Sequence, residues 1–251
     1  MARIVTIANQ KGGVSKTTTA HCLATGLTHL GYKVLAIDTD SQGNLTHAFG
    51  AKSTGLGLYE GLRKEATAIE LIQETQQGDI LPSTQLLTAA DLRFQDSSNK
   101  AYLLDDLLKS ARDKYNYIVI DTPPSLGILT INALTASNDV IIPMASDIFS
   151  IQGLLQLHNS INMVRKHNQY LKIAGILMTR FHSRTILNRD VKEIIEAKAA
   201  ELGTIVYKTI IREGIAVRES QIKRKSLFHY APRSKPAKDY INFINEYVRG
   251  V

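Results

Sequence analysis

A short apolar segment, a polar loop with two glycines and a helical pattern, in that order, most constrain the fold of this chain. Residues 3–8 (RIVTIA) are rich in β-branched side chains, which is typical of a buried strand. Residues 9–18 (NQKGGVSKTT) form the loop, and apolar residues recur at helical spacing over residues 16–30, before Gly31. A strand, loop and helix in this order direct backbone N–H groups and a helix N-terminus at one point, which favours anion binding.

The same alternation continues along the chain. Further strands are expected at residues 33–37, 117–120, 140–143 and 173–178, and further helices at residues 101–114, 151–167 and 188–202. Strands that alternate with helices of this length form βαβ units with right-handed crossovers. We therefore expect an α/β fold with a doubly wound, mostly parallel sheet and with functional sites at the carboxyl ends of the strands.

Length and composition limit the classes of protein to which the chain can belong. The 251 residues contain no repeat or Pro/Gly/Ser-rich linker, which predicts one domain over residues 1–251. A lone cysteine, Cys22, excludes a disulfide framework and a cysteine-rich metal cluster within one chain. No apolar segment approaches the roughly 18 residues that span a bilayer, and residues 1–10 do not resemble a signal peptide. We expect a cytoplasmic protein.

The positive charge is concentrated in one region of the chain. The net charge is +7, yet residues 1–125 carry 12 Lys and Arg against 13 Asp and Glu. Residues 180–238 carry 14 against 6 and account for the excess. A positive field confined to one region indicates a polyanionic partner, although a solvated basic face would give the same pattern.

The loop at residues 9–18 carries the side chains that a nucleotide phosphate site needs. Gly12 and Gly13 let the backbone approach phosphate oxygens closely. Lys16 can reach the β- and γ-phosphates, and the Thr17 hydroxyl can ligate Mg²⁺. A glycine-lysine turn without a ligand is the alternative interpretation of these residues.

The details of the loop identify a variant of the phosphate-binding pattern. Gln10 and Ser15 stand where the common G-x-x-x-x-G-K-[ST] pattern has glycines, and K-G-G-x-x-K-[ST], beginning at Lys11, matches instead. This variant resembles the deviant Walker A motif of the ParA/MinD superfamily of P-loop ATPases. The resemblance implies ATP and Mg²⁺ as cofactors and an ATP-sandwich homodimer, in which Lys11 reaches the nucleotide of the partner subunit.

Two aspartate-containing segments follow predicted strands and complete the expected site. Residues 38–44 (DTDSQGN) resemble the first switch of the family, in which the second aspartate, here Asp40, orients the attacking water; a turn capped by its own side chains is the alternative. Residues 117–124 (YIVIDTPP) resemble its Walker B strand and second switch, with Asp121 near Mg²⁺ through water. Thr17 and Asp40 are further candidate metal ligands.

The resemblance assigns two sets of residues to the ATP site. The candidate catalytic residues are Asp40, Lys11 and Lys16. The candidate ATP-binding residues are Lys11, Gly12, Gly13, Val14, Ser15, Lys16, Thr17, Thr18, Asp121 and Thr179. Thr179 is included because it ends a predicted strand where the family often has a polar residue that contacts the base.

The resemblance covers nearly the whole chain and separates its possible relatives. Residues 57–90 and 211–240 are similar to the corresponding segments of partition ATPases, and the short segment before Lys11 predicts a Soj-like protein without an N-terminal helix-turn-helix extension. Nitrogenase-type iron proteins and arsenite-pump ATPases need cysteines that this chain lacks. A MinD-type ATPase should end in a basic amphipathic helix, whereas residues 239–249 have almost no basic face, which predicts packing against the domain.

The family therefore supplies a specific expected function. It implies an ATP-dependent DNA partition protein whose dimer binds non-specific double-stranded DNA on the nucleoid. Slow ATP hydrolysis is expected to be stimulated by a ParB-type centromere-binding protein. The candidate DNA-binding residues are Arg184, Arg218, Lys223, Arg224, Lys225, Arg233 and Lys235. The alternatives are a MinD-like ATPase that positions a partner on the membrane and a protein in which ATP only locks the dimer.

Overall fold

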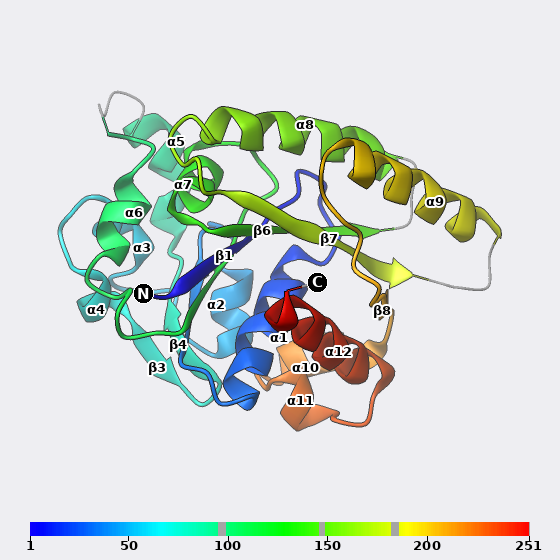
Figure 1. Cartoon of the computed structure of the whole chain (residues 1–251). Helices are drawn as coiled ribbons and strands as arrows, with labels where there is room; N and C mark the ends of the chain where they lie inside the picture. Colours follow the sequence, from blue (N-terminus) through cyan, green and yellow to red (C-terminus); the bar gives the residue numbers. More distant parts are fainter. Residues whose placement is uncertain (95–98, 146–148, 182–185, 251) are drawn as a thin grey trace.

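An eight-stranded sheet forms the centre of the fold (Figure 1) in the part of the chain that this computed structural model describes, residues 1–94, 99–145, 149–181 and 186–250. The strands are β1 (Arg3–Ile7), β2 (Val34–Asp38), β3 (Gln73–Thr75), β4 (Gly78–Leu81), β5 (Tyr117–Asp121), β6 (Asp139–Ala145), β7 (Lys172–Phe181) and β8 (Ile211–Arg212). Their order is β3-β4-β2-β5-β1-β6-β7-β8, and every neighbouring pair is parallel except β3 and β4. The predicted α/β fold with a doubly wound, mostly parallel sheet is confirmed.

Helices connect the strands and cover both faces of the sheet. They are α1 (Lys16–His29), α2 (Asn44–Phe49), α3 (Leu58–Leu62), α4 (Ala68–Leu71), the 3-10 helix η1 (Gln85–Ala89), α5 (Ala90–Arg93), α6 (Leu103–Leu108), α7 (Ile128–Ala136), α8 (Phe149–Val164), α9 (Ile186–Glu201), α10 (Ile215–Ile222), α11 (Leu227–Tyr230) and α12 (Lys235–Arg249). The helix expected over residues 101–114 is shorter, because the backbone after α6 closes tight turns such as Lys114 N–H to the Ala111 carbonyl.

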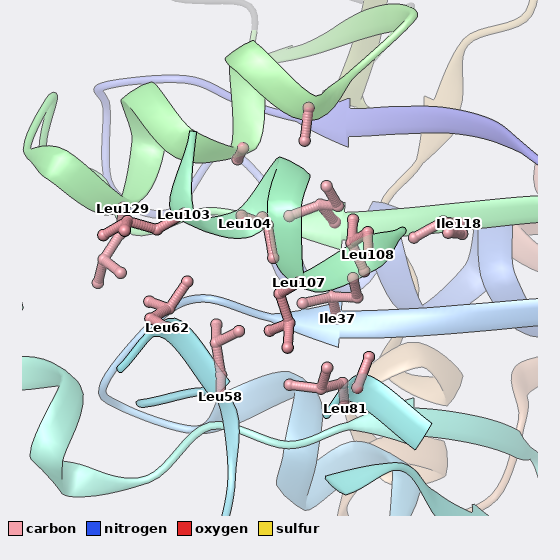
Figure 2. Close-up of a cluster of buried hydrophobic side chains, with 14 of the residues drawn as sticks. Ile37, Leu58, Leu62, Leu81, Leu103, Leu104, Leu107, Leu108, Ile118 and Leu129 are labelled. Atoms are coloured by element: carbon pink, nitrogen blue, oxygen red, sulfur yellow. The ribbon is translucent and has the colours of Figure 1, made fainter. Parts of the chain in front are cut away.

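The central strands are buried on both faces, as the near-continuous apolar segments predict. Ile118 and Ile120 of β5 belong to a cluster with leucines of α3, α6 and α7, part of which Figure 2 shows. Val119, between them, belongs to the cluster that contains residues of α1, α11 and α12 on the opposite face. The alternation of side chains along a strand therefore fixes β5 between two layers of helices.

The C-terminal helix α12 packs against α1, as expected for residues 239–249. Tyr240, Phe243 and Ile244 are fully buried. A Cβ at Gly26 of α1 would lie 2.3 Å from Cδ1 of Ile244, so a larger residue there would force the Ile244 side chain to shift. In the ranges that the structure describes, no helix combines the length and the apolar character that a membrane span requires.

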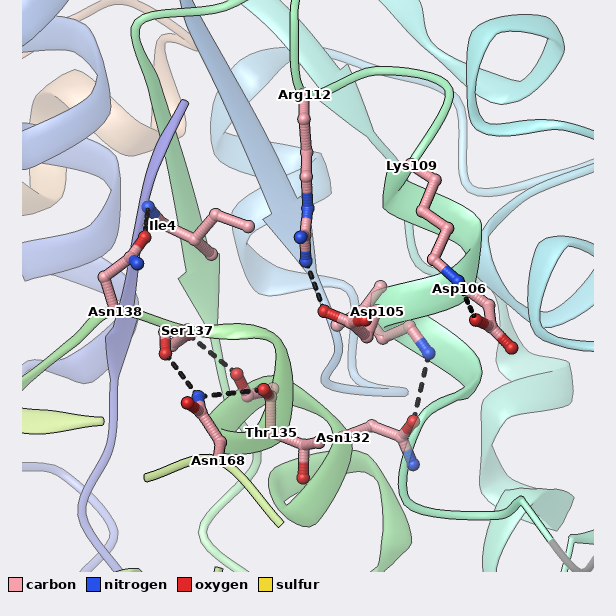
Figure 3. A network of polar contacts seen from close by, with 12 residues as sticks. Ile4, Asp105, Asp106, Lys109, Arg112, Asn132, Thr135, Ser137, Asn138 and Asn168 are labelled. Carbon is pink, nitrogen blue, oxygen red and sulfur yellow. Dashed lines mark hydrogen bonds and ion pairs between the residues drawn. The ribbon is translucent and has the colours of Figure 1, made fainter. Parts of the chain in front are cut away.

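Asparagine side chains join neighbouring elements at the amino-terminal end of the central strands (Figure 3). The Ile4 N–H donates to Asn138 Oδ1 over 2.8 Å, and the Leu104 N–H donates to Asn132 Oδ1 over 3.0 Å. Asn168 Nδ2 donates to the Ser137 carbonyl over 2.6 Å. These contacts pair backbone groups at the start of β1, at the start of α6 and after α7 that burial would otherwise leave unpaired.

A buried histidine in α1 predicts a loss of stability in weak acid. His21 is buried, its Nε2 lies 2.8 Å from Gln77 Oε1, and Gln77 Nε2 donates to the Ala48 carbonyl. Burial lowers the pKa of His21 to about 4. Since an unfolded histidine titrates near pH 6.5, the unfolded chain binds protons first and stability falls as the pH drops below that value. Urea denaturation at pH 7 and at pH 5 measures the free energy of unfolding of the wild type and of His21→Gln. Between these two pH values, this free energy should fall by about 2 kcal/mol more in the wild type than in the variant. An equal fall in the two proteins would contradict this account.

Candidate nucleotide site and basic surface

Three segments with candidate residues meet at the carboxyl ends of adjacent strands. The loop at residues 9–18 follows β1, Asp38 ends β2 and Asp121 ends β5. Because β5 lies between β2 and β1, Asp121 is in register with both Asp38 and Ile7. The sheet thus brings together residues that are more than eighty positions apart in the sequence, as the sequence predicts for this edge.

The loop folds into a tight bend that the helix α1 continues. Gly13 has φ +76° and Ser15 has φ +69°, so both adopt the left-handed conformation. A glycine at position 15 would adopt this conformation without the cost of about 1 kcal/mol that a side chain carries, which explains why the common pattern has glycine where this chain has Ser15. A Cβ at Gly12 or Gly13 would meet no atom within 4 Å, so the backbone there borders open space.

Lys16 lies buried at the base of the loop. Its Nζ donates to the Lys11 carbonyl over 3.0 Å. Burial lowers the pKa of Lys16, and the carboxylates of Asp121 and Asp40 act against that shift. The ammonium is therefore held within the field of two carboxylates, at the bend where an anion would enter.

Asp121 is the most unusual group of the site. It is fully buried, and neither carboxylate oxygen receives a hydrogen bond of normal length and angle. Burial and then the neighbouring charge of Asp38 raise its pKa well above the usual range, whereas the Thr17 hydroxyl and Lys16 favour the charged form. A buried carboxylate without a partner is costly, so it fits a position at which a divalent cation or its water supplies the missing contacts.

The candidate metal ligands, Thr17 and Asp121, suit magnesium better than a metal ion that is held by protein ligands alone. Within the described ranges, no group of three or more His, Cys, Asp or Glu side chains could hold a metal ion. Mg²⁺ is commonly held by one or two protein oxygens together with phosphate oxygens and water. The placement of Thr17 beside Asp121 is compatible with that chemistry, and their roles as metal ligands stay predictions.

The two aspartates of the DTD segment occupy different environments. Asp40 is 9% exposed and its Oδ1 accepts the Gln42 N–H over 3.0 Å. Asp38 is fully buried, and its oxygens accept the N–H groups of Asp40 and Thr46 and the Thr46 hydroxyl. Burial raises the pKa of Asp38 to about 6, although these hydrogen bonds oppose the shift. Asp38 therefore holds the backbone of the loop, and Asp40 is the less buried of the two carboxylates.

Side chains of β7 and α10 contact the loop. Thr179 Oγ1 lies 3.1 Å from the Val14 carbonyl oxygen and 3.3 Å from that of Met144. Thr179 is fully buried, and its hydroxyl connects the loop to β7. Its contact with a base stays a prediction, which this arrangement does not favour. The Thr18 hydroxyl accepts Gln221 Nε2 of α10 over 3.3 Å.

A cavity of about 210 Å³ lies beside the loop, and its lining includes residues that the sequence reasoning missed. Arg180, which follows Thr179 in β7, donates to the Gly13 carbonyl and pairs with Glu213, which follows β8. Arg218 of α10 pairs with the same Glu213 carboxylate over 3.2 Å. The carboxyl end of β8 would have been the signal for Glu213, but a strand of two residues leaves no pattern in the sequence.

The structure describes six of the seven candidate DNA-binding residues; Arg184 lies outside the described residues. The Arg218 side chain is 72% exposed. Lys223, Arg224 and Lys225 are exposed after α10, and Arg233 and Lys235 are exposed between α11 and the start of α12, a region whose helices are neighbours in Figure 1. Arg224 and Lys225 also border a hollow of about 380 Å³ with His29 and His229, two basic residues that the sequence reasoning did not include. Their contact with DNA stays a prediction.

Comparisons with known proteins give consistent relatives. The model of a family described as AAA domain matches residues 2–173. The chain is 37% identical over 251 residues to the sporulation initiation inhibitor protein Soj of Bacillus subtilis, with 98% of each chain covered. It is 35% identical over 246 residues to the chromosome partitioning protein ParA of Myxococcus xanthus, with 96% of this chain and 86% of that protein covered.

Solved structures repeat the fold over the whole chain. A putative plasmid partition protein from Borrelia burgdorferi bound to AMPPNP is 30% identical, with a TM-score of 0.84 and full coverage of both chains. Cobyrinic acid a,c-diamide synthase from Mycobacterium smegmatis with bound ADP and magnesium is 31% identical, with a TM-score of 0.87 and coverage of 99% of this chain and 95% of that one. The chain therefore belongs to the AAA domain family and, within it, to the group of the Soj and ParA chromosome partitioning proteins.

Proposed function

We propose that this protein is an ATP-dependent DNA partition protein that acts as one domain. In this proposal an ATP-sandwich homodimer binds non-specific double-stranded DNA on the nucleoid. It hydrolyses ATP to ADP and phosphate slowly until a ParB-type partner stimulates it. The observation that carries the nucleotide part is Asp121, a buried carboxylate at the end of β5 that receives no hydrogen bond of normal geometry and lies near Thr17 and Lys16 of the phosphate loop. The relatives named Soj and ParA support the partition role.

The residues of the chain divide the work of hydrolysis among them. Thr17 and Asp121 would hold Mg²⁺, which supplies positive charge at the phosphates. The backbone N–H groups at Gly12 and Gly13 and the ammonium of Lys16 would bind the β- and γ-phosphates. Asp40 would accept a hydrogen bond from the attacking water and hold it in line with the γ-phosphate. Lys11 would reach the nucleotide of the partner subunit.

The cavity beside the loop suggests where the base would lie. It is bordered by Gly13, Ser15 and Thr18 on one side and by Glu213, Gly214 and Val217 on the other. Pockets for planar ligands combine apolar walls with a few polar groups, and Val217 and Glu213 offer these two features. This cavity replaces Thr179 as the proposed site of the base contacts.

Arg218 gives a direct test of the DNA contact. Each phosphate neutralised by a basic side chain releases counterions, so Arg218→Glu should weaken ATP-dependent DNA binding about 10-fold or more and reduce the salt dependence of affinity. Electrophoretic mobility shifts over a range of salt concentrations measure both effects. Lys114→Glu, which makes the same charge change at an exposed residue beyond the other end of the sheet, is the matched control. Equal DNA affinity of the two variants would remove Arg218 from the interface.

The membrane alternative has less support from the chain. A MinD-like protein needs a terminal helix that is available to the bilayer, whereas the apolar side chains of α12 pack against α1. Sedimentation with liposomes of anionic lipid and a DNA mobility shift, both with ATP and Mg²⁺, distinguish the two proposals. We expect the protein to bind DNA and to remain in the supernatant with liposomes.

A further inference from the structure

Four residues, among them the proposed water-orienting Asp40, form a closed ring of hydrogen bonds. They are Asp38, Asp40, Thr46 and Ser83, and none is more than 9% exposed. Asp38 and Asp40 belong to the DTD segment, Thr46 lies in α2, and Ser83 follows β4. Ser83 thus joins the ring from a separate strand, forty-three residues beyond Asp40 in the chain.

Ser83 makes two contacts in the ring. Its hydroxyl donates to the Asp40 carbonyl over 2.5 Å, and its N–H donates to Thr46 Oγ1 over 2.9 Å. Thr46 Oγ1 in turn donates to Asp38 Oδ2 over 2.8 Å, and the Asp40 N–H donates to Asp38 Oδ1 over 3.1 Å. Both backbone polar groups of Asp40 are therefore held, the N–H by Asp38 and the carbonyl by Ser83.

The contacts of Asp40 itself show why the Ser83 hydroxyl matters. The Asp40 carbonyl also accepts the Gly43 N–H over 2.9 Å, which closes the turn, and the side chain accepts the Gln42 N–H. These two contacts lie within the loop and move with it. Among the hydrogen bonds described for Asp40, the one from Ser83 is the contact that fixes the loop to the end of a neighbouring sheet strand.

We propose that Ser83 is a positioning residue for ATP hydrolysis, which acts by holding the backbone of Asp40 so that its carboxylate meets the attacking water. This inference rests on the proposed function, since it assumes that Asp40 orients that water. A carboxylate that must be placed to a fraction of an ångström loses efficiency when its backbone is released, and a displacement of about 1 Å can cost a factor of about 100. Ser83 touches neither nucleotide nor water in this role.

The neighbouring residue provides a matched control. Thr84 is 5% exposed, and its hydroxyl is buried without a hydrogen-bond partner. Thr84→Val removes that hydroxyl at nearly constant volume, one position away from Ser83. Ser83→Ala removes a hydroxyl that donates to Asp40. A comparison of the two variants separates the loss of this particular hydrogen bond from the loss of any buried hydroxyl at this strand end.

The test is a double-mutant cycle with single-turnover ATP hydrolysis in the presence of Mg²⁺ and DNA. Ser83→Ala should slow hydrolysis about 10-fold, with the dissociation constant for ATP within about twofold of wild type, whereas Thr84→Val should keep the wild-type rate. Ser83→Thr, which keeps the hydroxyl, should restore most of the rate. In the Asp40→Ala background, Ser83→Ala should change the residual rate less than about twofold, because Ser83 acts through Asp40.

Two outcomes would overturn the inference. One is a loss smaller than about twofold in Ser83→Ala. The other is the same fold-loss in both backgrounds, which would indicate a general structural role. Failure of the proposed function would give a different result, since Asp40→Ala itself would then hydrolyse ATP at the wild-type rate. Thermal unfolding of each variant confirms that the rates belong to folded protein.

Discussion

Lys16→Ala is expected to abolish detectable ATP binding. Lys16 is buried at the base of the loop, and the Asp121 and Asp40 carboxylates lie close enough to affect its pKa. Its ammonium is the charge best placed to meet the β- and γ-phosphates, and truncation of a buried charged contact commonly weakens binding by a factor of about 100 or more. Titration with a fluorescent ATP analogue in the presence of Mg²⁺ measures the affinity.

A matched lysine variant separates this effect from a change in net charge. Lys33→Ala removes one positive charge from an exposed position just before β2, at the end of the sheet opposite the loop. It should bind ATP like the wild type. Thermal unfolding without nucleotide shows whether Lys16→Ala is folded. A folded Lys16→Ala protein that binds ATP as tightly as Lys33→Ala would contradict the assignment of the loop to phosphate binding.

Asp40→Ala is expected to retain ATP binding and to lose hydrolysis. Groups that position or deprotonate a nucleophile commonly contribute a factor of about 100 or more to a rate, so the single-turnover rate constant should fall by at least that factor. Asp113→Ala removes an exposed aspartate next to Lys114, remote from the loop, and is the matched control. Equal rates for Asp40→Ala and Asp113→Ala would favour a protein in which ATP only locks the dimer.

The three segments of the candidate nucleotide site could be predicted to meet because parallel strands end at one edge of the sheet. The loop, the DTD segment and Asp121 each follow an apolar segment, and strand order brings them together without any long-range contact having to be known. The positions of β1, β2, β5, β6 and β7 followed from apolar segments of ordinary length. The short strands β3, β4 and β8 contain too few residues to show the alternation of apolar and polar side chains that predicts a strand.

Other features could not be predicted because they depend on contacts between distant segments. Nothing in the residues near Ser83 indicates that its hydroxyl reaches the Asp40 carbonyl. The contact of Thr179 with the Val14 carbonyl depends on the approach of β7 to the loop, which the sequence does not show. The position of Thr179 at the end of a predicted strand suggested a base contact instead. The left-handed conformation of Ser15 is likewise visible only in the folded loop. In each case the tertiary arrangement determines the contact, and local propensity carries no information about it.

DNA binding measured under three nucleotide conditions tests the central claim most directly. The protein is incubated with a double-stranded DNA fragment without nucleotide, with ADP and Mg²⁺, or with ATP and Mg²⁺, at several salt concentrations. We expect binding only in the condition with ATP and Mg²⁺, and on DNA fragments of unrelated sequence. The affinity should fall steeply as salt rises, with a log–log slope of about −0.9 for each phosphate contact. Binding that is the same in all three conditions, or absent in all of them, would contradict an ATP-controlled DNA partition protein.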